Sequence, residues 1–220
     1  MQPRPAIVRI LWTATILLAA IGIASVIRRL LLLPETSSTG FDSGFARHPV
    51  LTTVHIIPGL LFMILGPLQF VRKLRVRHPR VHRWSGRVFM VVGLIIGGSA
   101  LVIAPQIAIG GVNETVATLL FGMFFLVALI KAFLYIRKRN VAQHREWMIR
   151  AFAIGLAVAT IRPIVGVFFA TSRITHLTPQ EFFGTAFWLG FTVQSMVAEI
   201  WINYTRPRPY RPLSTLGVDK

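Results

Sequence analysis

Six apolar segments dominate this sequence, and each is long enough to cross a lipid bilayer as a helix. A transmembrane helix needs about 20 mainly apolar residues, and 54% of the 220 residues are hydrophobic while only 14% are charged. A chain this apolar cannot keep its whole surface in water. We therefore predict an all-α polytopic membrane protein, one integral membrane domain over residues 1–220. The six predicted transmembrane helices lie near residues 10–33, 51–71, 87–109, 116–136, 147–170 and 183–204.

The positive charges lie in loops between alternate apolar segments. The chain carries 24 lysine and arginine residues against 7 acidic residues, a formal net charge of +17. This charge is not gathered on a soluble face, as nucleic-acid binding would need, but follows the positive-inside pattern of membrane proteins. We predict a multi-pass protein of the cytoplasmic (inner) membrane that contacts anionic lipid headgroups and no nucleic acid. Both termini and the tail 205–220 are then cytoplasmic.

Two absences narrow the interpretation further. The chain contains no cysteine, which excludes disulfides, thiolate metal sites and iron–sulfur clusters, so any cofactor must be held by nitrogen or oxygen ligands. The N-terminal segment begins like a secretion signal, but its apolar part is long and lacks a convincing small-residue cleavage site. We interpret it as a retained first helix. Phosphate loops, nucleophile elbows, zinc-protease motifs and dinucleotide fingerprints are also absent from the sequence, and no catalytic residue is predicted.

One motif occurs twice, each time after a basic run and at the start of an apolar segment. The first copy is His82-Arg83-Trp84-Ser85-Gly86-Arg87-Val88-Phe89, and the second is His144-Arg145-Glu146-Trp147-Met148-Ile149-Arg150-Ala151-Phe152, with Glu146 inserted. Because the two copies have the same orientation, the second and third segments match the fourth and fifth. Parallel repeats of this kind imply a pseudo-two-fold axis along the membrane normal. We expect a pseudo-symmetric four-helix core flanked by the first and last helices.

The two histidines of the repeat are the candidate cofactor ligands. Imidazoles on facing helices can supply both axial ligands of a low-spin heme b, so His82 and His144 would bind the iron. Glycines on the same helical faces, such as Gly93 and Gly155, would leave space for the porphyrin. The alternative is that both histidines are hydrogen-bonded at the level of the lipid headgroups. The cations that would meet the heme propionates are Arg83, Arg87, Arg145 and Arg150.

Among the residues of the apolar segments, Arg162 is predicted to have the highest free-energy cost of insertion into the membrane. Placing an arginine deep in a membrane helix costs roughly 2.5 to 3.5 kcal/mol on insertion scales, so its side chain must face a partner or water. His55 and Gln106 lie near its expected depth. Arg162 could contact an anion or a quinone carbonyl, or it could be a structural hydrogen-bonding hub.

The remaining polar candidates lie towards the cytoplasmic side. Glu199 is close in predicted depth to Arg150, so the two either form an ion pair or Glu199 carries protons. His55 lies near the opposite end of its helix, and the fourth segment has no histidine to match it, so a second heme is not expected. One polar inner site would then consist of Gln69, His82, His144, Arg150 and Glu199.

An ordered set of motifs resembles a known family. The set consists of His55-x-x-x-Gly59, Gly66-Pro67-Leu68-Gln69-Phe70, the two copies of the repeat, and Arg162. It is similar to the bacterial membrane-protein family catalogued as domain of unknown function 2306, from about residue 48 to residue 203. That family has no settled activity to carry over. A more distant likeness is to the two-heme transmembrane b-type cytochromes, where His82 and His144 would match one of the two histidine pairs.

Two functions follow as hypotheses. The first is a heme b-binding electron-transfer protein that exchanges electrons with a quinone or a redox partner. The alternative is a non-redox protein that binds or transports a small molecule, an anion or a proton, or that has a purely structural role.

Overall fold

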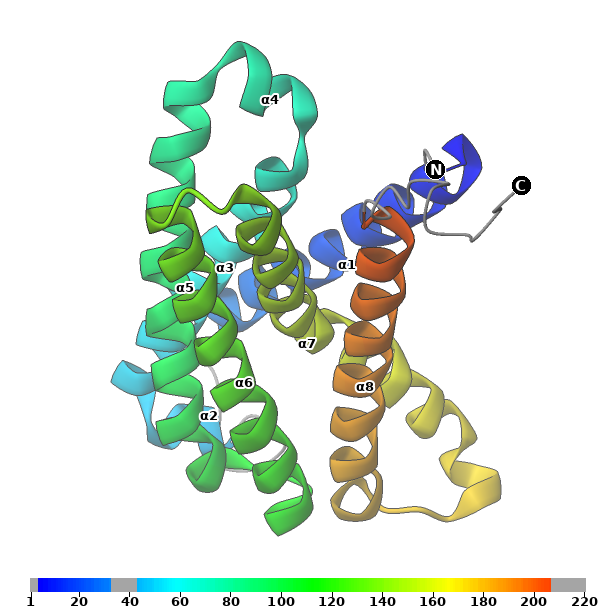
Figure 1. The fold of residues 1–220 in the computed structure, drawn as a ribbon. Coiled ribbons are helices and arrows are strands. Elements are labelled where there is room, and N and C mark those ends of the chain that lie inside the picture. The colour runs from blue at the N-terminus through cyan, green and yellow to red at the C-terminus, as the bar shows by residue number, and fades with distance from the viewer. Residues whose placement is uncertain (1–3, 33–42, 207–220) are drawn as a thin grey trace, which may run out of the picture.

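The computed structural model of the protein describes residues 4–32 and 43–206, and in these ranges the chain is helical throughout, with short connections (Figure 1). The predicted all-α fold is confirmed. The tail from residue 207, including Arg208 and Arg211, lies outside the described residues. The helices are α1 (Pro5–Leu32), α2 (Ser43–Arg47), α3 (Pro49–Phe70), α4 (Arg72–Arg77), α5 (Pro79–Ile107), α6 (Gly111–Arg137), α7 (Val141–Thr175) and α8 (Pro179–Thr205).

Five of the helices, α1, α3, α5, α6 and α7, are long and apolar enough to cross a membrane. Helix α8 is 27 residues long, as α6 is, but polar side chains such as Gln194 and Glu199 make it less apolar. It matches the sixth predicted segment in position. The chain is therefore a polytopic membrane protein, with α8 running beside the five more apolar helices.

All six long helices begin earlier than the sequence predicted, and in α5 and α7 the earlier start makes both copies of the repeat helical. Helix α5 begins at Pro79 rather than near residue 87, and α7 begins at Val141 rather than near residue 147. Proline suits a first helical turn because its fixed φ fits the helix and its missing N–H needs no partner there. Before α7, Asn140 is the N-cap and its side chain accepts a hydrogen bond from the Gln143 N–H at 3.1 Å. His82 and His144 consequently lie inside the first turns of α5 and α7.

A capping box fixes the start of α8. The Thr178 N–H donates to the Glu181 carboxylate at 2.7 Å, and the Thr178 hydroxyl lies 2.7 Å from the same oxygen. These hydrogen bonds lower the pKa of the Glu181 carboxyl. They satisfy backbone donors that would otherwise remain unpaired at the end of the helix.

Four helices, α3, α5, α6 and α7, form the core, and each contributes one phenylalanine to its centre. Phe62 stacks on Phe89 with ring centroids 4.4 Å apart, and it meets Phe125 edge-on at 5.6 Å and Phe152 at 6.1 Å. All four rings are buried. The pairs α3/α5 and α6/α7 thus supply matching side chains, as the predicted pseudo-two-fold repeat requires. We call these four residues the phenylalanine centre.

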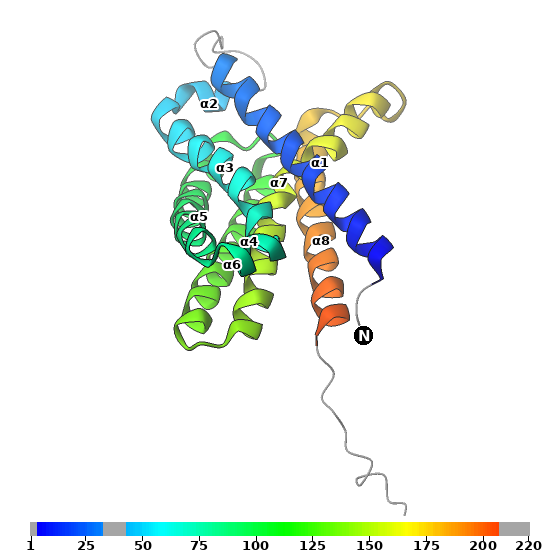
Figure 2. The ribbon, with the colours of Figure 1, turned by 90° about the horizontal axis from the view of Figure 1, so that it is seen from above.

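The first and last long helices flank this core. Helix α1 runs obliquely across α3 and α7, and α8 packs on α7 and α6 (Figure 2). Near the described ends of the chain, the Arg4 N–H donates to the Tyr204 hydroxyl at 3.4 Å. The start of α1 and the end of α8 therefore meet, on the side of the molecule where α4 arches between α3 and α5 (Figure 1). We call this side the α4 end.

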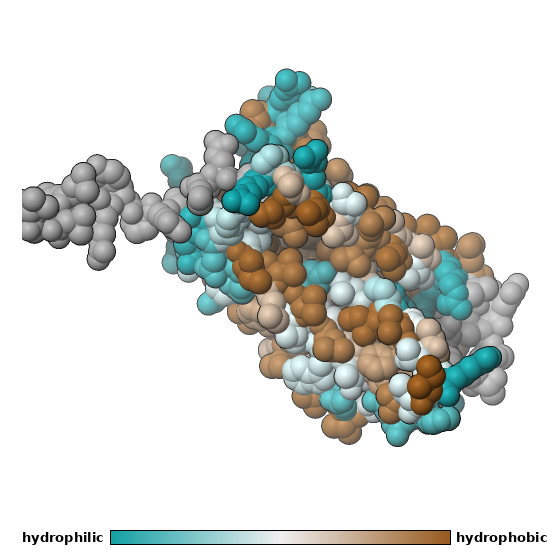
Figure 3. Space-filling view, turned by 90° about the vertical axis from the view of Figure 1, so that its right-hand side faces the viewer, coloured by the Kyte–Doolittle hydropathy of each residue, from teal (hydrophilic) through white to brown (hydrophobic). Residues whose placement is uncertain are grey.

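The surface agrees with a membrane setting. Apolar side chains cover the middle of the face shown in Figure 3, and hydrophilic ones lie towards its edges. Large apolar residues such as Ile10, Leu17 and Ile200 are more than half exposed, which is favourable in lipid and costly in water. The α4 end carries the basic run of α4 and the α6–α7 loop. Its assignment to the cytoplasm stays a prediction.

Candidate functional site

The two histidines of the repeat lie near each other at the α4 end. The His144 Nδ1 atom is 2.8 Å from the Ala132 carbonyl oxygen, so Nδ1 carries the proton and Nε2 keeps its lone pair. His82 is close enough for electrostatic interaction with His144 and Arg75. Its Nδ1 atom is buried and has no hydrogen-bond partner among the described residues. The ring nitrogens of these two histidines could therefore bind a metal ion or a hydrogen-bonding ligand.

The space expected for a porphyrin is filled by side chains. A Cβ built on Gly155 would lie 2.3 Å from the Phe62 ring, and one on Gly66 would lie 2.1 Å from the Phe152 ring. On α5, Gly93 and Gly97 accommodate Leu129 and Leu126 in the same way. These glycines let neighbouring helices interlock, which is the usual role of small residues in membrane bundles. As packed here, the residues between α5 and α7 do not fit a porphyrin, and heme binding stays a prediction.

The four arginines predicted to meet the propionates do not form one group. Arg83 and Arg87 are exposed on α5. Arg150 is paired with Glu199, its Nη2 atom lying 2.9 Å from Oε2. Arg145 donates to the Thr205 hydroxyl at 3.1 Å. Of these four arginines, Arg145 is the one whose side chain is part-buried and hydrogen-bonded to a neutral group.

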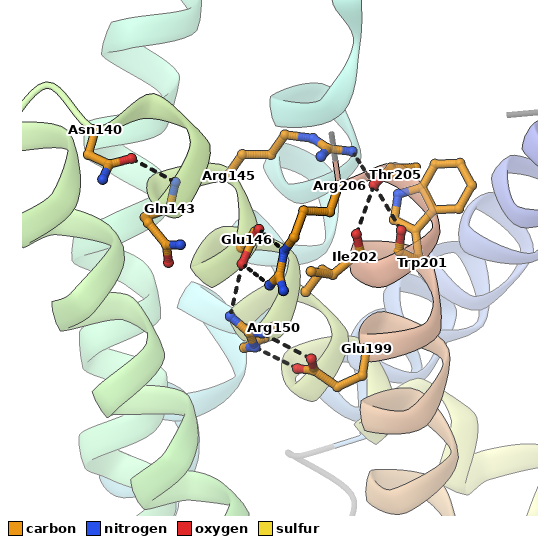
Figure 4. Close-up of polar contacts among 10 residues, drawn as sticks. All are labelled: Asn140, Gln143, Arg145, Glu146, Arg150, Glu199, Trp201, Ile202, Thr205 and Arg206. Carbon is orange, nitrogen blue, oxygen red and sulfur yellow. Dashed lines mark hydrogen bonds and ion pairs between the residues drawn. The ribbon is translucent and has the colours of Figure 1, made fainter. Parts of the chain in front are cut away.

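An ion-pair network joins α7 to the end of α8 (Figure 4). The predicted Arg150–Glu199 pair is present and is bidentate. Arg206 donates to both oxygens of Glu146, at 2.9 and 2.7 Å, and Arg150 lies 3.9 Å from Glu146. In the sequence Glu146 stands out only as an insertion in the repeat, and this role was not predicted, although its spacing of four residues from Arg150 is typical of a helical ion pair.

Three other predicted polar residues hydrogen-bond within α3 and α5 or between these two helices. Gln69 is 7% exposed and donates to the Ser85 hydroxyl at 3.0 Å, so it links α3 to α5. The His55 Nδ1 atom lies 2.9 Å from the Ser99 hydroxyl, further along the same pair of helices. Gln106 donates to the Val102 carbonyl on its own helix.

Arg162 lies at an exposed position on α7. Neither His55 nor Gln106 is its partner in the contacts above. A buried hydrogen-bonding hub, one of its two predicted roles, does not fit this exposure. A long flexible side chain at an exposed position can reach water at the membrane boundary.

A cavity that the sequence did not reveal lies between α1, α3, α7 and α8. Its volume is about 260 Å³, and Arg75 of α4 and Arg145 of α7 line it. No carboxylate is among its lining residues. Its walls consist of Val8, Leu11, Trp12, Thr15, Pro67, Phe70, Arg75, Arg145, Ile149, Phe152, Ala153, Leu156, Gln194, Val197, Ala198 and Trp201. The lining residues come from five separate helices, so no sequence motif contains them. The position of Arg145 in the repeat was the one feature of the sequence that pointed to this region.

The structure defines a polytopic helical membrane protein with a cavity, lined by two arginines, between α1, α3, α7 and α8. Its sequence matches the family described as "Predicted membrane protein (DUF2306)" over residues 52–202. The match covers more than half of the chain, so the protein belongs to this family, as the motif resemblance suggested. No curated protein and no solved structure matches the chain.

Proposed function

We propose that this membrane protein binds a small anionic molecule in the cavity between α1, α3, α7 and α8, with its negative group at Arg75 and Arg145. This is the non-redox alternative of the sequence analysis. The observation that carries it is the charge of the lining, which contains two arginines and no acidic residue.

The contrast with the neighbouring arginines supports the proposal. Arg150 and Arg206 are each neutralised by a glutamate. The Arg145 side chain bonds only to a hydroxyl in the described contacts, and the Arg75 side chain is exposed, with neither a hydrogen bond nor an ion pair to another described residue. Two like charges beside an apolar cavity repel each other in a medium of low dielectric constant. An anion held between them would remove that repulsion and gain charge-assisted hydrogen bonds.

A second hollow at the same end is a weaker candidate. Its volume is about 510 Å³, but it is an open surface groove lined by Arg72, Lys73, Val76 and Arg77. Four residues of one short helix cannot enclose a small molecule, whereas ligand sites usually bury most of the ligand surface. Arg72 therefore serves as a control position, since it lies on the same helix as Arg75 but outside the cavity.

The binding test uses two anions, octanoate and inorganic phosphate, with the protein in nanodiscs of neutral phosphatidylcholine. We expect at least one of them to change the tryptophan emission, because Trp12 and Trp201 line the cavity. Removing one charge-assisted hydrogen bond costs about 1.5 to 3 kcal/mol, so Arg75→Gln should weaken binding about tenfold or more. Arg72→Gln should bind as the unchanged protein does. If neither anion binds, or if both variants behave alike, the proposal is wrong.

Colour tests the competing heme function. Because side chains fill the space beside the glycines, we expect folded protein that was expressed with ample heme to show no Soret band. Two observations favour heme: the buried Nδ1 of His82 has no hydrogen-bond partner among the described residues, and the His144 Nδ1 bond to the Ala132 carbonyl leaves Nε2 as the atom that would bind iron. A Soret band that shifts on reduction, and that disappears in the double variant His82→Ala and His144→Ala, would establish electron transfer as the better hypothesis. The proposed quinone contact at Arg162 would then be worth testing as well.

A further inference from the structure

We infer that the ligand of this cavity is a single-chain carboxylate amphiphile, of the fatty-acid type, which reaches it from the surrounding bilayer between α1 and α8. The inference rests on the anion site proposed above and adds the chemistry and the route of the ligand.

The lining has the polarity of an amphiphile. At one end lie the two arginines, and the rest of the wall is mainly apolar or aromatic, including Leu11, Phe152 and Leu156. Gln194, one of the few other polar lining residues, donates its Nε2 hydrogen to the Thr160 hydroxyl at 2.7 Å. A strongly hydrated anion such as phosphate would leave most of this wall in contact with water. A hydrocarbon tail would cover it favourably, because it removes apolar surface of the wall from water.

The size of the cavity indicates one short chain rather than two. A volume of about 260 Å³ corresponds to roughly nine waters at the ~30 Å³ that each takes in the liquid. A hydrocarbon tail of about eight to ten carbons would fill it, with its carboxylate at the exposed Arg75. A phospholipid with two long chains would not fit without separating the helices.

The direction of the cavity matches the orientation of an amphiphile in one leaflet. Arg145 lies in the first turns of α7 and bonds to Thr205 at the very end of α8, so the positive end is at the membrane boundary. Gln194 lies 11 residues before Thr205 on α8, about 16 Å deeper at 1.5 Å per residue. A carboxylate held by the arginines would therefore place its tail towards the bilayer centre, as in free lipid.

The ligand would enter the cavity from the bilayer between α1 and α8. Helix α1 packs on α3 and α7, and both α1 and α8 line the cavity. Beside this wall, Ile16 of α1 and Met196 of α8 are 51% and 58% exposed, and Val197, which lines the cavity, is 39% exposed. Figure 3, which faces the side where α8 and the start of α1 lie, shows apolar side chains over this surface. A lipid-dissolved molecule can approach it without crossing water.

The experiment compares decanoate, butyrate and inorganic phosphate as radiolabelled probes in equilibrium dialysis. The protein is in phosphatidylcholine nanodiscs, and empty nanodiscs give the background of probe dissolved in lipid. We expect decanoate to bind at least tenfold more tightly than butyrate, and phosphate to bind least. Arg75→Gln should weaken decanoate binding about tenfold, because the carboxylate loses one of its two arginines.

A matched pair of variants on α1 tests the place of the tail. Thr15 lines the cavity, whereas Thr13 is exposed and is not a lining residue. Thr15→Phe should fill the tail site and remove most of the advantage of decanoate over butyrate. Thr13→Phe, which adds the same ring to the same helix, should leave that advantage unchanged.

The outcomes separate the inference from the proposed function. If phosphate and butyrate bind as tightly as decanoate and lose affinity in Arg75→Gln, the anion site is correct and the amphiphile is wrong. If Thr15→Phe and Thr13→Phe bind decanoate equally well, the tail does not occupy the cavity and the inference is overturned. If no probe binds above the empty-nanodisc background, both proposals fail.

Discussion

Replacing Arg150 by leucine should lower the free energy of unfolding by about 1.5 to 3 kcal/mol, the cost of losing hydrogen bonds to a charged group, because the Glu199 side chain is 45% exposed and the pair is only half-buried. The Arg150 side chain is only 14% exposed. It holds Glu199 through two hydrogen bonds and lies 3.9 Å from Glu146. Without it, Glu199 keeps its charge beside hydrocarbon with no arginine bonded to it. Unfolding by sodium dodecyl sulfate, followed by circular dichroism in mixed micelles, measures the change.

Two further variants make this prediction specific. Changing both partners, Arg150→Leu with Glu199→Leu, should restore most of the lost stability, because a pair replaced by apolar residues of similar size is often neutral. Arg137→Leu should have little effect, since Arg137 is exposed at the end of α6. If the single and double variants at Arg150 and Glu199 unfold alike, the pair does not hold α7 to α8.

Depth along the helices was enough to predict this pair. Arg150 and Glu199 are too costly to leave apart in an apolar segment, and counting residues from the ends of the predicted helices puts them at one level. The repeat likewise predicted that α3 and α5 correspond to α6 and α7, because equal order and orientation of two hairpins restrict how they can pack. The interlocked core follows from these two constraints.

The direction in which each side chain points from its helix was harder to predict. The candidate partners of Arg162 were chosen from depth alone, but depth does not say which neighbour a helix meets at each turn. The cavity escaped notice for a similar reason, because Trp12, Arg75, Gln194 and Trp201 are distant in sequence and share no motif. The glycines posed a further ambiguity. Small residues on a helix face permit close approach, and only the packed structure shows that phenylalanine and leucine rather than a cofactor occupy the space.

Gly155→Ala is the sharpest test of that packing, and we expect it to destabilise the protein by about 1 to 3 kcal/mol, the usual cost of overpacking a core. The new methyl group would lie 2.3 Å from the Phe62 ring. That ring cannot easily withdraw, because it is buried and is held by Phe89, Phe125 and Phe152. The same unfolding assay in mixed micelles measures the loss.

Gly166→Ala on the same helix is the matched control. A Cβ there meets nothing within 4 Å, and alanine favours helix over glycine by up to about 1 kcal/mol, so this variant should be as stable as the unchanged protein or more so. The difference between the two variants isolates the collision at the phenylalanine centre from the effect of alanine on the helix. Equal stability of both would mean that the four rings can rearrange at little cost. A core that yields so easily could also open for a flat cofactor, and the argument against heme between α5 and α7 would then fail.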